Sequence, residues 1–249
     1  MEQQETAADL PTGFLSLPSE LRNKIYELSL VKGEDTFALS ENIRRYFYHK
    51  RGLASGLLLA SKAIHREASP ILYGQNRFDF CEVSPRELRT FLNQIGKNNA
   101  SYIRHVTIDF PGFRSLYGEI SLERDIAATL EAIRGACDNI ITITAFAGNN
   151  YYRMYPLSAL DRQNAAPEVI SLINTRFRSM TSLQEIIVEI DDDSPSDGTR
   201  KIMESHGWLL RKCEPYKERW DVMTAIIHVL VALRVVKIAC GDLWRRAAE

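Results

Sequence analysis

Residues 102–110 read YIRHVTIDF, and their arrangement of apolar positions returns in NIITITAFA at 139–147, LQEIIVEID at 183–191 and LRVVKIACG at 233–241. Each stretch follows one template: apolar, two others, apolar, one other, apolar. Each is also preceded by residues whose apolar positions recur at helical spacing. A helix followed by a strand, repeated along a chain, sets the strands side by side and parallel. The pattern therefore predicts an α/β protein with a parallel sheet.

The shared template matches the L-x-x-L-x-L core of a leucine-rich repeat, in a long and irregular form. Each helix–strand unit of such an array buries its apolar face only against its neighbours. We predict a leucine-rich-repeat-like α/β region over residues 81–249, with four parallel strands near positions 105, 143, 187 and 236. An ordinary α/β sheet of four crossovers is the alternative, because the spacing between the units is irregular.

Residues between the apolar positions of a strand point to its opposite face. This face mixes charged, aromatic and aliphatic residues, which suits a protein partner better than a small molecule. We expect it to be open and to bind a protein. Its members are His105, Thr107, Asp109, Thr142, Thr144, Phe146, Glu185, Ile187, Glu189, Val235 and Lys237.

A helical region precedes the repeats, over residues 13–80. In FLSLPSELRNKIYELSLV, at 14–31, apolar residues recur at helical spacing and polar residues fill the other positions. A second helical stretch, LLLASKAIHREA, follows at 57–68. Either the second stretch covers the apolar face of the first, or a partner does, because two or three half-exposed Leu or Ile side chains form a docking patch. That face consists of Leu17, Leu21, Ile25 and Leu28.

The two helical stretches together resemble the F-box-like domain of a large group of fungal proteins. The matching residues are the opening Leu17-Pro18-x-Glu20-Leu21, the stretch from Leu58 to Ala68 and the tail from Ile71 to Phe78. F-box domains are three-helix modules that dock on the small linker subunit of cullin–RING ubiquitin ligases. The resemblance therefore implies binding of that linker subunit through Leu17, Pro18, Leu21, Ile25, Leu28 and Leu58.

The resemblance, joined to the repeats, implies a non-enzymatic adaptor that brings an unknown protein substrate to a ubiquitin ligase. A scaffold protein that never meets the linker subunit is the first alternative. The second is a nucleic-acid-binding protein that uses RRYFYHKR at 44–51, since cations interleaved with aromatics can hold single strands.

Composition indicates a folded intracellular protein. Apolar residues make up 45% and charged residues 25%, which excludes wholesale disorder, although residues 1–12 are polar and are expected to be disordered. Lys and Arg number 31 against 32 Asp and Glu, so no net charge favours nucleic acid or a membrane. The cysteines are far apart, no signal peptide is visible, and the apolar run 222–233 is too short to span a bilayer.

No catalytic, metal-binding or cofactor-binding motif is evident. The chain has no G-x-S-x-G, no P-loop and no dinucleotide-binding fingerprint. Asp193, Asp197, Gly198 and Glu204 match part of an EF-hand loop, but Pro195 occupies a ligand position. We expect an exposed acidic loop there, and neither a metal, a cofactor nor a catalytic site.

Overall fold

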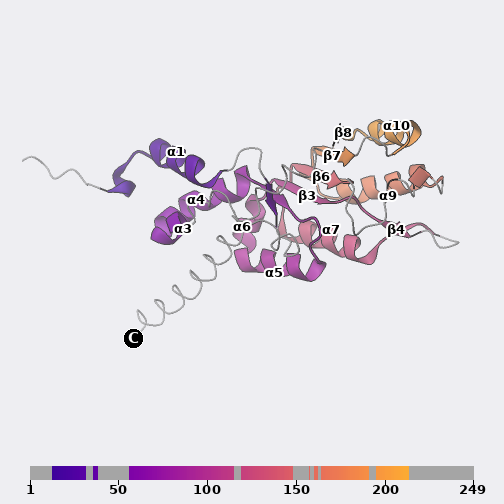
Figure 1. The fold of residues 1–249 in the computed structure, drawn as a ribbon. Helices are drawn as coiled ribbons and strands as arrows, with labels where there is room; N and C mark the ends of the chain where they lie inside the picture. Colours follow the sequence, from indigo (N-terminus) through magenta and orange to yellow (C-terminus); the bar gives the residue numbers. More distant parts are fainter. Residues whose placement is uncertain are drawn as a thin grey trace, which may run out of the picture.

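The computed structural model describes residues 13–31, 36–38, 56–114, 119–147, 157, 160–161, 164–190 and 195–212. Within these residues the protein is a mixed α/β structure (Figure 1). The N-terminal helices gather at one end of the molecule, and a sheet with flanking helices forms the rest (Figure 1).

A parallel sheet of six strands is the centre of the structure, and its spatial order follows the order of the strands in the chain. Every neighbouring pair runs parallel. Sequential order with parallel pairing requires each connection to cross back over the same face, if all connections share the usual right hand. The strands are β1 (Thr36–Ala38), β2 (Arg77–Asp79), β3 (His105–Asp109), β6 (Thr142–Phe146), β7 (Glu185–Ile190) and β8 (Leu209–Lys212).

The prediction of neighbouring parallel strands near 105, 143 and 187 is confirmed. In the register, Val106 of β3 lies opposite Ile143 of β6, which lies opposite Ile186 of β7. All three side chains are buried and belong to one continuous hydrophobic core. The predicted strand near 236 and its helix lie outside the described residues.

The strand that pairs with β7 is β8, which the sequence pattern did not predict. It follows helix α10 (Asp197–Ser205), in the stretch where we expected an acidic loop. The helix has nine residues, and its buried positions are Thr199 and Met203. The Ser196 hydroxyl caps its first turn by accepting a hydrogen bond from the Thr199 amide. An acidic run with two buried positions gives too weak a periodicity to identify a helix.

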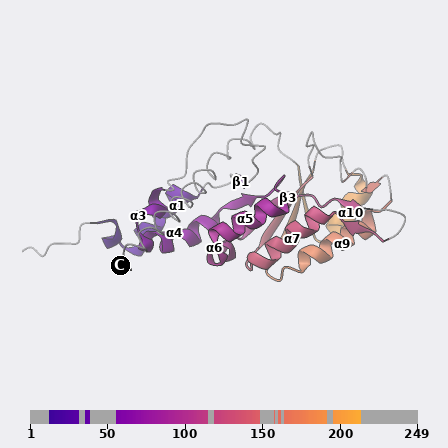
Figure 2. The same cartoon turned by 90° about the horizontal axis from the view of Figure 1, so that it is seen from below.

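Helices line one face of the sheet. Figure 2 shows α5 (Pro85–Ile95), α6 (Lys97–Tyr102), α7 (Arg124–Ala136) and α9 (Ala166–Arg178) in a row. A capping box begins α5: the Ser84 hydroxyl accepts a hydrogen bond from the Glu87 amide, and the Glu87 carboxylate accepts one from the Ser84 amide. A two-residue antiparallel pair, β4 (Phe113–Arg114) with β5 (Ser121–Leu122), precedes α7.

The N-terminal region contains a 3₁₀ turn, η1 (Phe14–Ser16), and the helices α1 (Ser19–Leu30), α3 (Gly56–Ala60) and α4 (Lys62–Gln75). Both α1 and α3 pack against α4. Helix α4 continues through Pro70 to Gln75, although proline inside a helix usually ends or kinks it. Burial of Leu72 and Tyr73 after the proline outweighs the lost backbone hydrogen bond.

Buried Asn76 joins this region to the sheet. Its side-chain amide donates to the carbonyl of Leu30 (2.8 Å), the last residue of α1, and to that of Leu72 (2.7 Å), which begins the last turn of α4. The next residue, Arg77, begins β2. The helical region therefore shares its sheet and its hydrophobic core with the helices and strands that follow it.

We predict that Asn76→Ala lowers the free energy of unfolding by about 2–4 kcal/mol, because each buried carbonyl left without a donor costs about 1–3 kcal/mol. Urea denaturation measures the change. Asn93→Ala, at an exposed position of α5, is the matched control and should leave stability unchanged or slightly raised. Equal stability of the two variants would contradict the role assigned to Asn76.

Tyr73 supports a second prediction, because its hydroxyl is buried and has no hydrogen-bond partner among the described residues. Burial also raises the pKa of Tyr73 above its ordinary value. We expect Tyr73→Phe to leave the free energy of unfolding unchanged or raise it by up to about 1 kcal/mol, since it removes an uncompensated polar group. Tyr102→Phe, at an exposed position, is the control. A clear loss of stability in Tyr73→Phe alone would show that the hydroxyl has a partner.

Candidate protein-interaction surfaces

A charged cluster fixes the orientation of α1 on α4. Arg22 donates from Nε and Nη2 to the two carboxylate oxygens of Glu67, at 2.8 and 2.7 Å, and the Tyr26 hydroxyl donates to the same carboxylate at 2.9 Å. Arg22 also donates to the carbonyls of Leu15 and Leu17, just before the helix. A bidentate guanidinium–carboxylate pair has a narrowly defined geometry, so it sets which side of α1 meets α4.

The titration behaviour of the cluster follows from these contacts. The hydrogen bond from Arg22, followed by that from Tyr26, lowers the pKa of Glu67. Burial, followed by the bond to the Glu67 carboxylate, raises the pKa of Tyr26 to about 12. At neutral pH the cluster therefore contains one carboxylate, one guanidinium and a neutral phenol.

The contacts with α4 leave the predicted apolar side of α1 outside. Arg22, Tyr26 and Leu30 lie four residues apart along one side of the helix, and Tyr26 and Leu30 are buried. On the other side, Leu21 is 53% exposed and Leu28 is 76% exposed. The sequence left two alternatives for the apolar face of the first helix: it is covered by the second helical stretch, or by a partner. The first alternative is wrong for Leu21 and Leu28.

The other predicted linker-binding residues occupy mixed environments. Leu17 and Ile25 are half-buried, and Pro18 is exposed. Leu58 is only 4% exposed and belongs to the hydrophobic core. The prediction that Leu58 lies on the linker-binding surface is therefore corrected. Its burial follows from the packing of α3 on α4. We call Leu21, Ile25 and Leu28 the α1 apolar face.

Two exposed leucines were missed. Leu15, in η1, is 48% exposed, and Leu59, in α3, is 40% exposed. Leu15 and Leu17 both lie in the apolar segment just before α1, which begins at Ser19. Neither could be identified from helical spacing, because one precedes the helix and the other lies in a helix of a single turn.

The predicted polar positions of the strands share one face of the sheet. The register aligns them in three rows across β3, β6 and β7. We call these nine residues the cross-strand face. The rows are His105–Thr142–Glu185, Thr107–Thr144–Ile187 and Asp109–Phe146–Glu189.

The expectation that this face is open is wrong over most of its area. His105, Glu185 and Glu189 are half-buried, and the remaining six residues are buried. Thr107, Thr142 and Thr144 are only 4%, 8% and 7% exposed. Asp109, Phe146 and Glu189 all have further interaction partners. The correction applies to Thr107, Asp109, Thr142, Thr144, Phe146 and Ile187.

Charge on the cross-strand face is limited. Burial, helped by the positive charges of Arg77 and Arg104, lowers the pKa of His105 and leaves its ring neutral at pH 7. The Thr142 hydroxyl donates to the Glu185 carboxylate at 3.4 Å. In the row His105–Thr142–Glu185, the His105 ring is therefore neutral and the Glu185 carboxylate accepts a hydrogen bond from Thr142.

The described cysteines lie in the core. Cys81 and Cys137 are both buried. Burial, together with the negative charge of Asp138, raises the pKa of Cys137 to about 12, so its thiol stays protonated and unreactive. Within the described ranges, no group of three His, Cys, Asp or Glu side chains could hold a metal ion.

Some predicted elements lie outside the described residues. These are residues 1–12, the basic-aromatic stretch 44–51, and Val235 and Lys237 of the fourth predicted strand. In the part of the chain that is described, no helix has both the length and the apolar character needed to cross a bilayer. Comparisons with protein-family models, curated proteins and solved structures found no match.

The Arg22–Glu67 pair predicts a defined acid sensitivity. Because the pKa of Glu67 is lowered in the folded state, its contribution to stability is present above about pH 4.5 and is lost as the pH falls through the folded value. We expect Glu67→Gln to be less stable than the unmodified protein at pH 7, with a difference that shrinks below pH 4.5.

Urea denaturation between pH 7 and pH 3 measures this difference. Glu204→Gln, at an exposed position of α10, is the matched control and should follow the unmodified protein across the range. A difference between Glu67→Gln and the unmodified protein that persists unchanged to pH 3 would contradict the proposed role of the Glu67 charge.

Proposed function

We propose that this protein is a non-enzymatic adaptor whose F-box-like N-terminal helices bind the small linker subunit of a cullin–RING ubiquitin ligase. Its leucine-rich-repeat-like region would then hold a protein substrate. The observation that carries the proposal is the α1 apolar face, where Leu21 and Leu28 remain largely exposed while Tyr26 and Leu30, on the other side of the helix, are buried. The proposed site of action is the cytoplasm or the nucleus, where such ligases work.

Exposure of these leucines has a physical cost that a partner would remove. Burying a Leu side chain is worth about 1.5–3 kcal/mol. Leu21, Ile25 and Leu28 follow the i, i+4, i+7 spacing of a helix that presents one side to a groove. Their positions match the F-box-like opening of the sequence, and Leu15 and Leu17 extend the apolar surface toward η1.

The rigid seating of α1 supports the same proposal. The bonds of Arg22 and Tyr26 to Glu67 hold the helix against α4 and stop it from rotating to bury Leu21 and Leu28. A face held outward in the free protein needs no rearrangement before binding, which lowers the entropic cost of association.

The sheet region supports a substrate-holding role in a more restricted way. Its parallel order repeats one helix–strand arrangement several times, as expected for an array with an extended surface. The half-buried residues His105, Glu185 and Glu189 retain some contact with solvent on the cross-strand face. We place the substrate contact at this margin rather than at the buried threonines.

The double variant Leu21→Asp/Leu28→Asp tests the adaptor function. We expect the unmodified protein to bind the purified linker subunit with a micromolar or tighter dissociation constant, measured by isothermal titration calorimetry. The double variant should bind at least about 100-fold more weakly, because each buried leucine contributes roughly one to two powers of ten. Its stability should be unchanged, since both side chains are exposed in the free protein.

Leu209→Asp is the control, because Leu209 is an exposed leucine on β8, at 47% against 53% for Leu21. It should bind the linker subunit like the unmodified protein. No complex at linker concentrations up to about 100 μM, or equal binding by the double variant, would contradict the proposal and favour a scaffold protein outside the ligase.

A further inference from the structure

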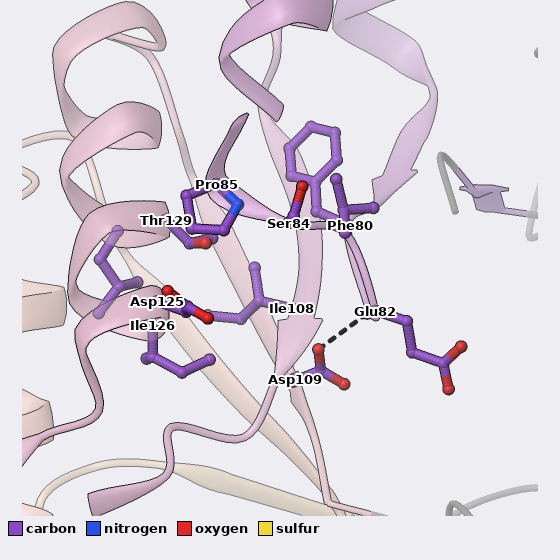
Figure 3. Close-up of a pocket in the computed structure, with 11 residues that line it drawn as sticks. Phe80, Glu82, Ser84, Pro85, Ile108, Asp109, Asp125, Ile126 and Thr129 are labelled. Carbon is purple, nitrogen blue, oxygen red and sulfur yellow. Dashed lines mark hydrogen bonds between the residues drawn. The ribbon is translucent and has the colours of Figure 1, made fainter. Parts of the chain in front are cut away.

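A pocket of about 170 Å³ lies at the carboxyl ends of β2 and β3, where α5 and α7 begin (Figure 3). Its floor is apolar and buried, with Phe80, Ile108 and Leu130 among the lining residues. Ser84 and Asp125 at its rim are exposed. The carboxyl edge of a parallel sheet is where ligands bind in many α/β proteins.

The lining of the pocket is acidic. Glu82, Asp109 and Asp125 are among the lining residues, although Figure 3 shows the Glu82 carboxylate directed away from α7. No Lys, Arg or His is among the described residues that line the pocket. Asp109 accepts a hydrogen bond from the Glu82 amide at 2.8 Å, and both of these residues have further partners. Asp125 is therefore the carboxylate on which a ligand contact is built.

Thr129 supplies an independent polar group. It is only 6% exposed, it lines the pocket, and its hydroxyl makes no hydrogen bond with another described residue. Thr129 follows Asp125 by one helical turn, and Figure 3 shows both side chains directed from α7 into the pocket. A hydroxyl that lines the pocket without a hydrogen bond to another described residue can pair with an atom of a ligand there.

Two helix N-termini point at the pocket and would by themselves favour an anion. The α5 terminus is already neutralised, because Glu87 accepts bonds from the amide and the hydroxyl of Ser84. Each N-terminus is equivalent to roughly half a positive charge, so the full charge of Asp125 exceeds that of α7. The pocket therefore keeps a negative balance.

We propose that this pocket binds the side chain of a lysine or an arginine presented by a protein segment. The aliphatic stem lies on the apolar floor, and the cationic group lies between the Asp125 carboxylate and the Thr129 hydroxyl. Long basic side chains combine an apolar stem with a charged head in this way. A pocket of similar volume holds one benzene molecule, so a single side chain matches the space.

The proposal goes beyond the adaptor function and does not depend on it, because the pocket belongs to the repeats and not to α1. A free alkylammonium ion carries the same chemistry as a lysine side chain. The experiment therefore compares N-acetyl-lysine methylamide and N-acetyl-arginine methylamide with n-butylammonium. N-acetyl-norleucine methylamide serves as an uncharged ligand with the same stem.

Methyl NMR of the full chain reports binding at Ile108 and Ile126, which both line the pocket. We expect the lysine or arginine derivative to shift these methyl signals, and the norleucine derivative to shift neither. Tighter binding of the lysine derivative than of n-butylammonium supports a protein segment as the source. Equal binding of the two would overturn that source and assign the pocket to free amines.

Asp125→Asn and Thr129→Val test the two polar contacts and preserve side-chain shape. Each should weaken binding of the lysine derivative at least tenfold. Glu168→Gln is the matched control, because Glu168 is an exposed carboxylate in the first turn of α9, outside the pocket, and should change nothing. Absence of any shift at about 50 mM ligand, or unchanged binding by Asp125→Asn, would overturn the proposal. Linker-subunit binding is measured on the same variants and should remain intact.

Discussion

Parallel pairing of strands is the constraint on which the rest of the structure depends. A strand must bond its backbone groups to neighbours on both sides, and a buried strand must also cover its apolar side chains. In the middle of this sheet, β6 pairs along its whole length with both β3 and β7. The apolar row of Val106, Ile143 and Ile186 then faces the helices, and the polar rows necessarily take the opposite face.

The same constraint draws the N-terminal helices into the body of the protein. Because β1 and β2 extend the sheet beyond β3, the helices that connect and precede them cannot form a separate unit with its own core. Asn76 closes the ends of α1 and α4 directly before β2 begins. A partner bound to α1 would therefore be held in a fixed orientation relative to the sheet.

Helix α1 shows how one ion pair decides what a helix offers to solvent. Its sequence has an apolar side and a mixed side, and hydrophobic burial alone would select the apolar one. The bidentate bond from Arg22 to Glu67, with Tyr26 and Leu30 buried alongside, selects the mixed side instead. The exposed leucines are thus a consequence of a polar contact elsewhere on the same helix, and they make α1 suited to a partner.

Sequence by itself determined the parts of the structure that depend on short-range patterns. The period of the strands at 105, 143 and 187, the helices before them and the capping box at Ser84 all follow from residues within a few positions of one another. Tertiary structure alone decided which side of α1 is buried, because Glu67 lies 45 residues from Arg22 in the chain. It also decided the continuation of α4 through Pro70, the pairing of β8 with β7, the burial of the cross-strand threonines, and the pocket beside Thr129. Each of these depends on contacts between distant segments, which local periodicity does not encode.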